Sequence, residues 1–190
     1  MSTFRQLAFA FGSVVCLVLA VNATTPPASK IAPAGVFDLD SDPISSSSRL
    51  EKRVVVESDG WRLVGELRIP RASRPMSAVI LLNKANGDRK VYVELAQRLA
   101  DRGIASLRID LRGHGESINK GKFVPFQENS TDILKDTDKD IVSVIEYLSS
   151  VKGIDAKRIG VVGASYSGEE MAVAGRQRGY AKAYVALSPG

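Results

Sequence analysis

The chain has 190 residues, of which 44% are hydrophobic and 25% charged, and its formal net charge is +5. This length and composition are ordinary for one globular domain with a short leader. Lys and Arg alternate with Asp and Glu instead of clustering, so the charge indicates a solvated surface and excludes the basic patch of a nucleic-acid-binding protein.

The first 23 residues have the pattern of a signal peptide. Arg5 supplies a positive charge, residues 7–21 are apolar almost throughout, and Val21-Asn22-Ala23 resembles a cleavage site. The apolar stretch is shorter than the about 20 residues that span a bilayer. We therefore predict a secreted or periplasmic protein, attached to a membrane only if this segment stays uncleaved. The only cysteine, Cys16, lies in the segment, so a cleaved chain has no disulfide.

The leader is followed by a predicted linker and then by the domain. Residues 24–50 are rich in Pro, Ala, Ser and Asp and contain too few apolar side chains to build a core, which predicts a flexible linker. Residues 51–190 form the predicted domain. It opens with strands expected over 52–57 and 61–69, which the turn signal Ser58-Asp59-Gly60 joins into an antiparallel hairpin.

Beyond the hairpin, apolar strands alternate with amphipathic helices. We expect strands over 78–82, 104–109, 158–162 and 183–187, and helices over 88–102, 132–148 and 169–177. Such alternation with short connections predicts an α/β fold with a doubly wound, mostly parallel sheet and helices on both faces. Reactive groups in these sheets lie just beyond the carboxyl ends of the strands. Residues 82–89, residues 110–117 and Ser165 all fall at that edge.

Ser165 lies in Gly163-Ala164-Ser165-Tyr166-Ser167-Gly168, between an expected strand and an expected helix. A serine on a sharp turn with small neighbours is the layout that a nucleophile needs. A serine hydroxyl without a base is a poor nucleophile, and neither His nor Asp follows Ser165. The only histidine, His114, belongs to a Gly-His-Gly turn, for which we predict a structural role.

With these segments placed, residues 52–190 resemble the α/β-hydrolase superfamily. The resemblance rests on the hairpin and on the strand over residues 79–82 with Gly87-Asp88-Arg89 opening a helix. It also rests on Asp110-Leu111-Arg112-Gly113-His114-Gly115-Glu116-Ser117 and on the six residues Gly163-Ala164-Ser165-Tyr166-Ser167-Gly168. It implies that Ser165 is the nucleophile and that the backbone N–H groups of Tyr166 and of Ala85 (or Lys84) hold the oxyanion. It also implies a serine hydrolase that cleaves a small-molecule ester, or less readily an amide, through an acyl-enzyme and without a cofactor.

Three features depart from the pattern of that family. Ser167 stands where a second glycine is usual, and we expect the turn to accept it with some strain. The loop over residues 83–87 lacks the His-Gly pair that opens it in relatives. Family members also carry an acid and then a histidine after the serine, whereas Glu169 and Glu170 are the only acids here and suit the start of a helix.

The missing acid and histidine leave two hypotheses open. In the first, the chain is the N-terminal part of a hydrolase, incomplete at its C-terminus, and residues 183–187 form an unprotected apolar edge strand. In the second, the domain is a degenerate, non-catalytic one that binds a ligand or partner, or a remnant without function. The sequence predicts neither the oligomeric state nor the identity of the substrate.

Other glycine-rich sites and a zinc site are excluded. Gly163 and Gly168 have the spacing of a phosphate-binding loop, but Glu169-Glu170 replace its Lys-Ser/Thr and place negative charge where phosphates would bind. Gly160 does not complete a dinucleotide fingerprint with them. The chain has no His/Cys cluster for zinc. We therefore predict neither a cofactor nor a metal.

Overall fold

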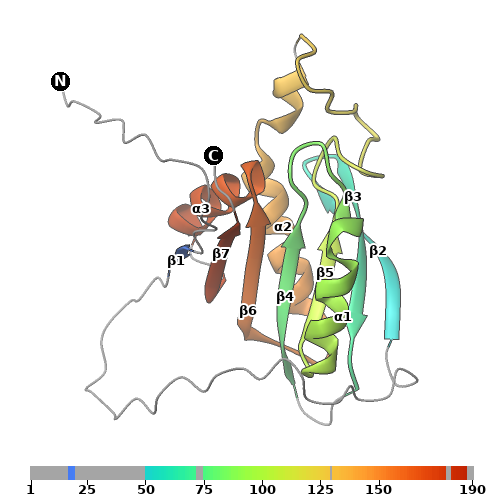
Figure 1. Cartoon of the computed structure of the whole chain (residues 1–190), viewed down its shortest axis with the longest axis vertical. Coiled ribbons are helices and arrows are strands. Elements are labelled where there is room, and N and C mark those ends of the chain that lie inside the picture. Colours follow the sequence, from blue (N-terminus) through green and yellow to red (C-terminus); the bar gives the residue numbers. More distant parts are fainter. Residues whose placement is uncertain (1–16, 20–49, 72–74, 129, 179–180, 188–190) are drawn as a thin grey trace, which may run out of the picture.

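The computed structural model describes residues 17–19, 50–71, 75–128, 130–178 and 181–187. Its strands are β1 (Leu17–Leu19), β2 (Leu50–Ser58), β3 (Trp61–Ile69), β4 (Met76–Leu82), β5 (Ala105–Ile109), β6 (Ile154–Ala164) and β7 (Ala183–Leu187). Its helices are the 3-10 turns η2 (Arg89–Tyr92) and η3 (Ser130–Leu134) and the α-helices α1 (Val93–Asp101), α2 (Thr137–Ser150) and α3 (Tyr166–Arg178). The strands form one sheet in the order β1-β7-β6-β4-β5-β3-β2 (Figure 1).

The predicted hairpin is confirmed. β2 and β3 pair antiparallel along their whole length, ending with Ser58 opposite Trp61. The turn between them places Asp59 at φ 50° and Gly60 at φ 76°. Two consecutive residues with positive φ match the twist of a tight hairpin, and glycine adopts this conformation without a steric cost. β3 then pairs antiparallel with β5, which attaches the hairpin to the rest of the sheet.

The parallel part of the sheet consists of β5, β4, β6 and β7, which pair in that order. This confirms the doubly wound core, which antiparallel strands flank on both sides. β6 is longer than the expected strand over 158–162 because Ile154 already pairs with Met76. A register shift between Met76 and Ala78 accommodates the more polar residues before Ile159.

Helices cover both faces of the sheet, as predicted. Figure 1 shows α1 in front of the strands and α2 behind them. Along β4 the buried side chains alternate between the two faces. Leu81 packs with Tyr92 and Ala96 on the face of α1. Ile80 and Leu82 belong to the larger core on the other face, to which α2 and α3 contribute. A continuous apolar run is therefore needed at β4.

Two expected helices begin differently from their prediction. The helix over 88–102 starts as the 3-10 turn η2, where the Asp88 carboxylate accepts the N–H of the residue two positions later at 2.8 Å. Gly103, at φ 71°, ends α1 as predicted. The helix over 132–148 is divided into η3 and α2 because Asp136 adopts a left-handed conformation at φ 65°.

The prediction of an unprotected edge at residues 183–187 is wrong. β7 pairs on its free side with β1, where Val18 lies opposite Val185. The apolar segment satisfies the backbone groups that the edge strand would otherwise expose. Apart from Leu17–Leu19 and Leu50, the predicted leader and linker lie outside the described residues, and both stay predictions. No helix in the described parts of the chain is long and apolar enough to cross a membrane.

Candidate active site

Ser165 is the single residue between the end of β6 and the start of α3, so the predicted strand–turn–helix layout is confirmed. Its backbone has φ 53°. A left-handed conformation at a residue other than glycine is uncommon and is held in place only by the surrounding structure. The Ser165 N–H donates to Leu187 O at 2.9 Å, and its carbonyl accepts the Gly168 N–H at 2.8 Å. These bonds fix the turn from both sides.

Gly163 permits the close approach of the strand and the helix at this turn. A Cβ atom on Gly163 would lie 2.6 Å from the carbonyl oxygen of Ser167, closer than packed atoms come. Gly168 is less crowded, since its nearest neighbour would be Gly163 O at 3.3 Å. The requirement for glycine is therefore strongest before the serine.

Ser167 is fully buried, and all its polar contacts are to backbone atoms. Its Oγ accepts the Ala164 N–H at 2.9 Å and lies 3.3 Å from Leu82 O and 3.1 Å from Ala164 O. The turn therefore accepts a serine at this position because hydrogen bonds satisfy its hydroxyl. The left-handed conformation in this turn lies at Ser165.

Ala85 lies in the turn that follows β4. The Gly87 N–H donates to Lys84 O at 3.0 Å, and Asn86 between them adopts φ 61°. The buried side chain of Asn83 braces the turn: its Nδ2 donates to Lys84 O at 3.0 Å, and its Oδ1 accepts the Leu111 N–H at 2.9 Å. Asn83 thus holds the loop where relatives carry His-Gly.

The topology brings the two predicted oxyanion-binding loops to the same edge. β4 and β6 are neighbouring parallel strands, and Leu82 is in register with Gly163. Ala85 follows three residues after Leu82, and Ser165 follows two residues after Gly163. As the first residue of α3, Tyr166 carries a backbone N–H that the helix itself does not use. The roles of Ser165, Tyr166 and Ala85 in catalysis stay predictions.

The side chain of Tyr166 is fixed beneath the turn. Its hydroxyl lies 3.0 Å from Thr137 Oγ1, and its ring stacks on the His114 ring with centroids 5.8 Å apart. Burial raises the pKa of Tyr166 above its usual value. The side chain is therefore a neutral phenol at pH 7.

His114 is buried and packed against two aromatic rings. The Phe123 ring lies 5.3 Å away and the Tyr166 ring 5.8 Å away, centroid to centroid, and both stack on the imidazole. Nδ1 lies 2.9 Å from Arg112 O, and because a carbonyl oxygen only accepts, Nδ1 carries the proton. Nε2 has no partner among the described residues. Burial lowers the pKa of His114, so the ring is neutral at pH 7, in agreement with a structural role.

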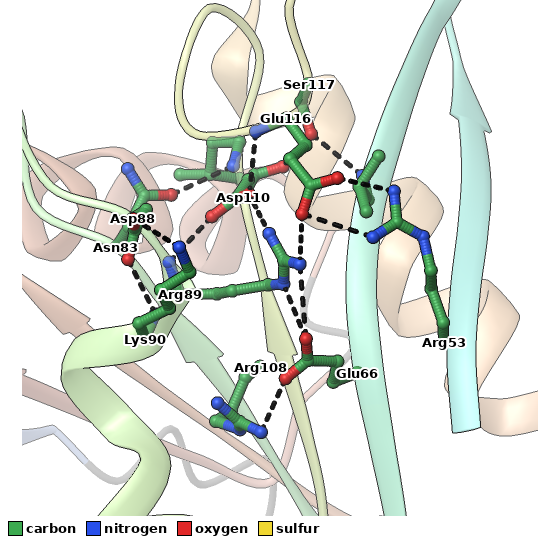
Figure 2. A network of polar contacts seen from close by, with 12 residues as sticks. Arg53, Glu66, Asn83, Asp88, Arg89, Lys90, Arg108, Asp110, Glu116 and Ser117 are labelled. Atoms are coloured by element: carbon green, nitrogen blue, oxygen red, sulfur yellow. Dashed lines mark hydrogen bonds and ion pairs between the residues drawn. The ribbon is translucent and has the colours of Figure 1, made fainter. Parts of the chain in front are cut away.

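Asp110 organises the third segment at this edge (Figure 2). Its carboxylate is fully buried and accepts the backbone N–H groups of Arg89 at 2.6 Å and Glu116 at 3.0 Å. The Arg89 guanidinium binds Asp110, Glu66 and Glu116, and Glu116 also pairs with Arg53 at 2.6 Å. One ionic network therefore holds together the loop after β5, the β2–β3 hairpin and the start of η2.

A second buried ion pair holds Arg112. Its guanidinium donates to the Asp140 carboxylate through Nε at 3.0 Å and Nη2 at 2.6 Å. Asp140, on α2, also accepts the Ser58 hydroxyl at 2.7 Å. Asp110 and Arg112 were visible as a motif, but sequence reasoning missed their partners because Arg89 and Asp140 lie 21 and 28 residues away.

A cavity of about 650 Å³ lies between residues of segment 86–91 and residues of segment 113–125. His114 contributes to its wall, together with exposed apolar side chains such as Val91 and Val124. Ser165, Tyr166 and Ala85 are not among its lining residues. The described residues also contain no group of three or more His, Cys, Asp or Glu side chains that could hold a metal.

Comparison with known proteins identifies the family of this chain. A family model described as serine aminopeptidase, S33, matches residues 73–186. An uncharacterized 31.7 kDa protein of Escherichia coli is 31% identical to this chain over 103 residues, which are 53% of this chain and 33% of that protein. The chain therefore spans about a third of the curated relative it matches.

Solved structures show the same fold at low identity. The α/β hydrolase GrgF from Penicillium sp. sh18 has a TM-score of 0.61 and 20% identity, with 74% of this chain and 46% of that chain covered. The acetyl xylan esterase from Paenibacillus sp. R4 has a TM-score of 0.60 and 18% identity, with 90% and 52% covered. This chain spans about half of each of these two structures and has their α/β-hydrolase fold.

Proposed function

Because the chain belongs to the serine aminopeptidase S33 family of α/β hydrolases, we propose that it carries the nucleophile of a serine hydrolase. The observation that carries the proposal is the conformation of Ser165. This residue alone forms the turn between β6 and α3, and it is held at φ 53°. A strained serine at this turn is the arrangement that exposes a nucleophilic hydroxyl above the sheet.

The proposed reaction is the cleavage of an ester, in preference to an amide, in two steps. Ser165 Oγ attacks the carbonyl carbon and loses its proton to a base, which returns the proton to the departing alcohol. The backbone N–H groups of Tyr166 and Ala85 hold the negative oxygen of the intermediate. Water then cleaves the acyl-enzyme, releases the acid and restores the serine hydroxyl.

His114 is not the proposed base. Its Nδ1 proton is directed to Arg112 O, and its ring stacks on both Phe123 and Tyr166. The proposal therefore takes the base from outside the described residues.

A fluorophosphonate probe tests the proposal on the native full-length protein. We expect the probe to label one peptide, with the adduct on Ser165, and we expect Ser165→Ala to abolish labelling. Ser149→Ala is the matched control, since Ser149 on α2 only bonds Ile145 O at 2.7 Å. A label on another residue contradicts the proposal. Absence of any label in the folded wild type favours the non-catalytic, ligand-binding alternative.

A further inference from the structure

The Ser167 hydroxyl lies between the two parts of the proposed site, which are the turn at Ser165 and the loop after β4. It is fully buried on the first turn of α3. Its oxygen accepts the Ala164 N–H at 2.9 Å. Its single proton faces two carbonyl oxygens, Leu82 O at 3.3 Å and Ala164 O at 3.1 Å. A hydroxyl can accept and donate at the same time, so Ser167 bridges two backbone segments.

Both segments lead directly into the proposed chemistry. Ala164 is the residue before Ser165, and Leu82 is the last residue of β4, three positions before Ala85. A shift between the ends of β4 and β6 would change the distance between the Ser165 hydroxyl and the oxyanion donor of the loop. The Ser167 side chain forms hydrogen bonds at the end of β4 and at the end of β6.

Such a restraint supports the left-handed backbone of Ser165. A residue held at φ 53° stays there only when neighbouring contacts outweigh its local cost. Glycine, the usual residue at position 167 in the family, has no side chain and therefore cannot make such contacts. The three contacts of the Ser167 hydroxyl therefore restrain the turn at Ser165 in a way that glycine at position 167 would not.

We propose that Ser167 is a positioning residue, whose buried hydroxyl holds Ser165 in register with the oxyanion loop after β4. The inference rests on the proposed function and adds a residue to it. Ser167 does not touch the substrate. It acts through the backbone of Ala164 and Leu82.

The test compares variants of the native full-length protein by their rate of fluorophosphonate labelling at Ser165. Ser167→Ala removes the hydroxyl, and Ser167→Cys replaces it with a somewhat larger thiol that forms weaker hydrogen bonds. Ser167→Gly supplies the residue usual in the family. We expect each to lower the maximal labelling rate, kinact, about tenfold or more while KI stays unchanged, because misplacement affects the reacting atoms and not probe binding. The phosphorus-31 shift of the adduct should change as well.

Ser58→Ala is the matched control for lost stability. Ser58, the last residue of β2, is also buried, and its hydroxyl donates to Asp140 Oδ1 at 2.7 Å. We expect this variant to lose as much stability as Ser167→Ala while keeping the wild-type kinact. Since the three Ser167 variants differ in how they fill the site, labelling is read on those that circular dichroism shows to be folded.

The outcomes separate the inference from the function on which it rests. Wild-type kinact in Ser167→Ala or Ser167→Cys, or an equal fall in Ser58→Ala, overturns the inference alone. A faster reaction in Ser167→Gly overturns it too, because it would mean that serine strains the turn. Wild-type protein that is folded but never labelled overturns the proposed function and the inference together.

Discussion

Arg89 and Asp110 are joined twice, through side chain and backbone. Arg89 Nη1 lies 2.5 Å from Asp110 Oδ2, and the Arg89 N–H donates to Asp110 Oδ1 at 2.6 Å. Arg89 opens η2 after the loop over residues 83–87, and Asp110 follows the last residue of β5. The pair therefore fixes the loop that carries Ala85 to the segment that begins after β5, at the edge where Ser165 lies.

Removal of the Arg89 guanidinium tests this anchor. Arg89→Met leaves the Asp110 carboxylate buried without its counter-charge, which costs about 3–5 kcal/mol. Unfolding in urea at pH 7 measures the loss. Arg98→Met is the control, because the Arg98–Glu94 pair is exposed on α1 and such pairs are worth about 0.5 kcal/mol or less. Equal losses in the two variants would show that the buried pair does not anchor the fold.

Glu116 should make the stability of the fold depend on pH in the acid range. Hydrogen bonds from Arg53 and then from Arg89 lower the pKa of Glu116 from 4.5 to about 2. The folded state therefore releases the proton more readily, and this stabilisation is complete above the unfolded value. It is lost as the pH falls from about 4.5 to about 2.

The Glu116→Gln variant isolates that contribution. It should show a flatter decline of unfolding free energy across the same pH range, measured by urea titration at each pH. Above that range the difference between the two proteins should be constant. A wild-type decline as flat as that of the variant contradicts the assignment.

The fold could be predicted because local patterns specify it. The unbroken apolar residues of β4 indicate a strand covered on both faces, and the alternation along β3 indicates a half-exposed one. The signal in each case lies within one element. β1 pairs with β7 through residues such as Val18 and Val185, which are distant in sequence. No local sequence pattern predicted this pairing.

The candidate site was predicted only in part, for the same reason. Small residues around Ser165 identify the turn, since they are adjacent in the chain. The bond from Ser167 to Leu82 spans 85 residues, and the sequence showed only an unexplained serine. Buried polar side chains choose partners by geometry, so their contacts appear only when the strands are placed side by side.

His114 should also contribute a pH dependence, at a higher pH than Glu116. Burial lowers its pKa below the usual 6.5, opposed in part by the Arg112 carbonyl and by Asp110 and Asp140. The unfolded chain then binds the proton first, so stability is lost as the pH falls from about 6.5 toward the folded value. His114→Phe keeps the aromatic stacking and should remove this part of the slope. An unchanged slope in thermal unfolding between pH 7 and pH 5 would show that His114 does not titrate as described.

Gly163 provides the sharpest test of the turn, because β6 offers a control glycine on the same strand. A Cβ on Gly163 would lie 2.6 Å from Ser167 O and 2.9 Å from Gly168 N, and these backbone atoms cannot move without opening the turn. Gly163→Ala should therefore cost more than about 2 kcal/mol of stability and abolish labelling at Ser165.

Gly160→Ala adds the same methyl group where the nearest atom is 3.6 Å away, an ordinary contact. We expect it to stay within about 1 kcal/mol of wild type and to be labelled normally. Both properties are measured on the same preparations, by urea unfolding and by the fluorophosphonate probe. Similar behaviour of the two variants would mean that the close approach at Gly163 is not what shapes the turn.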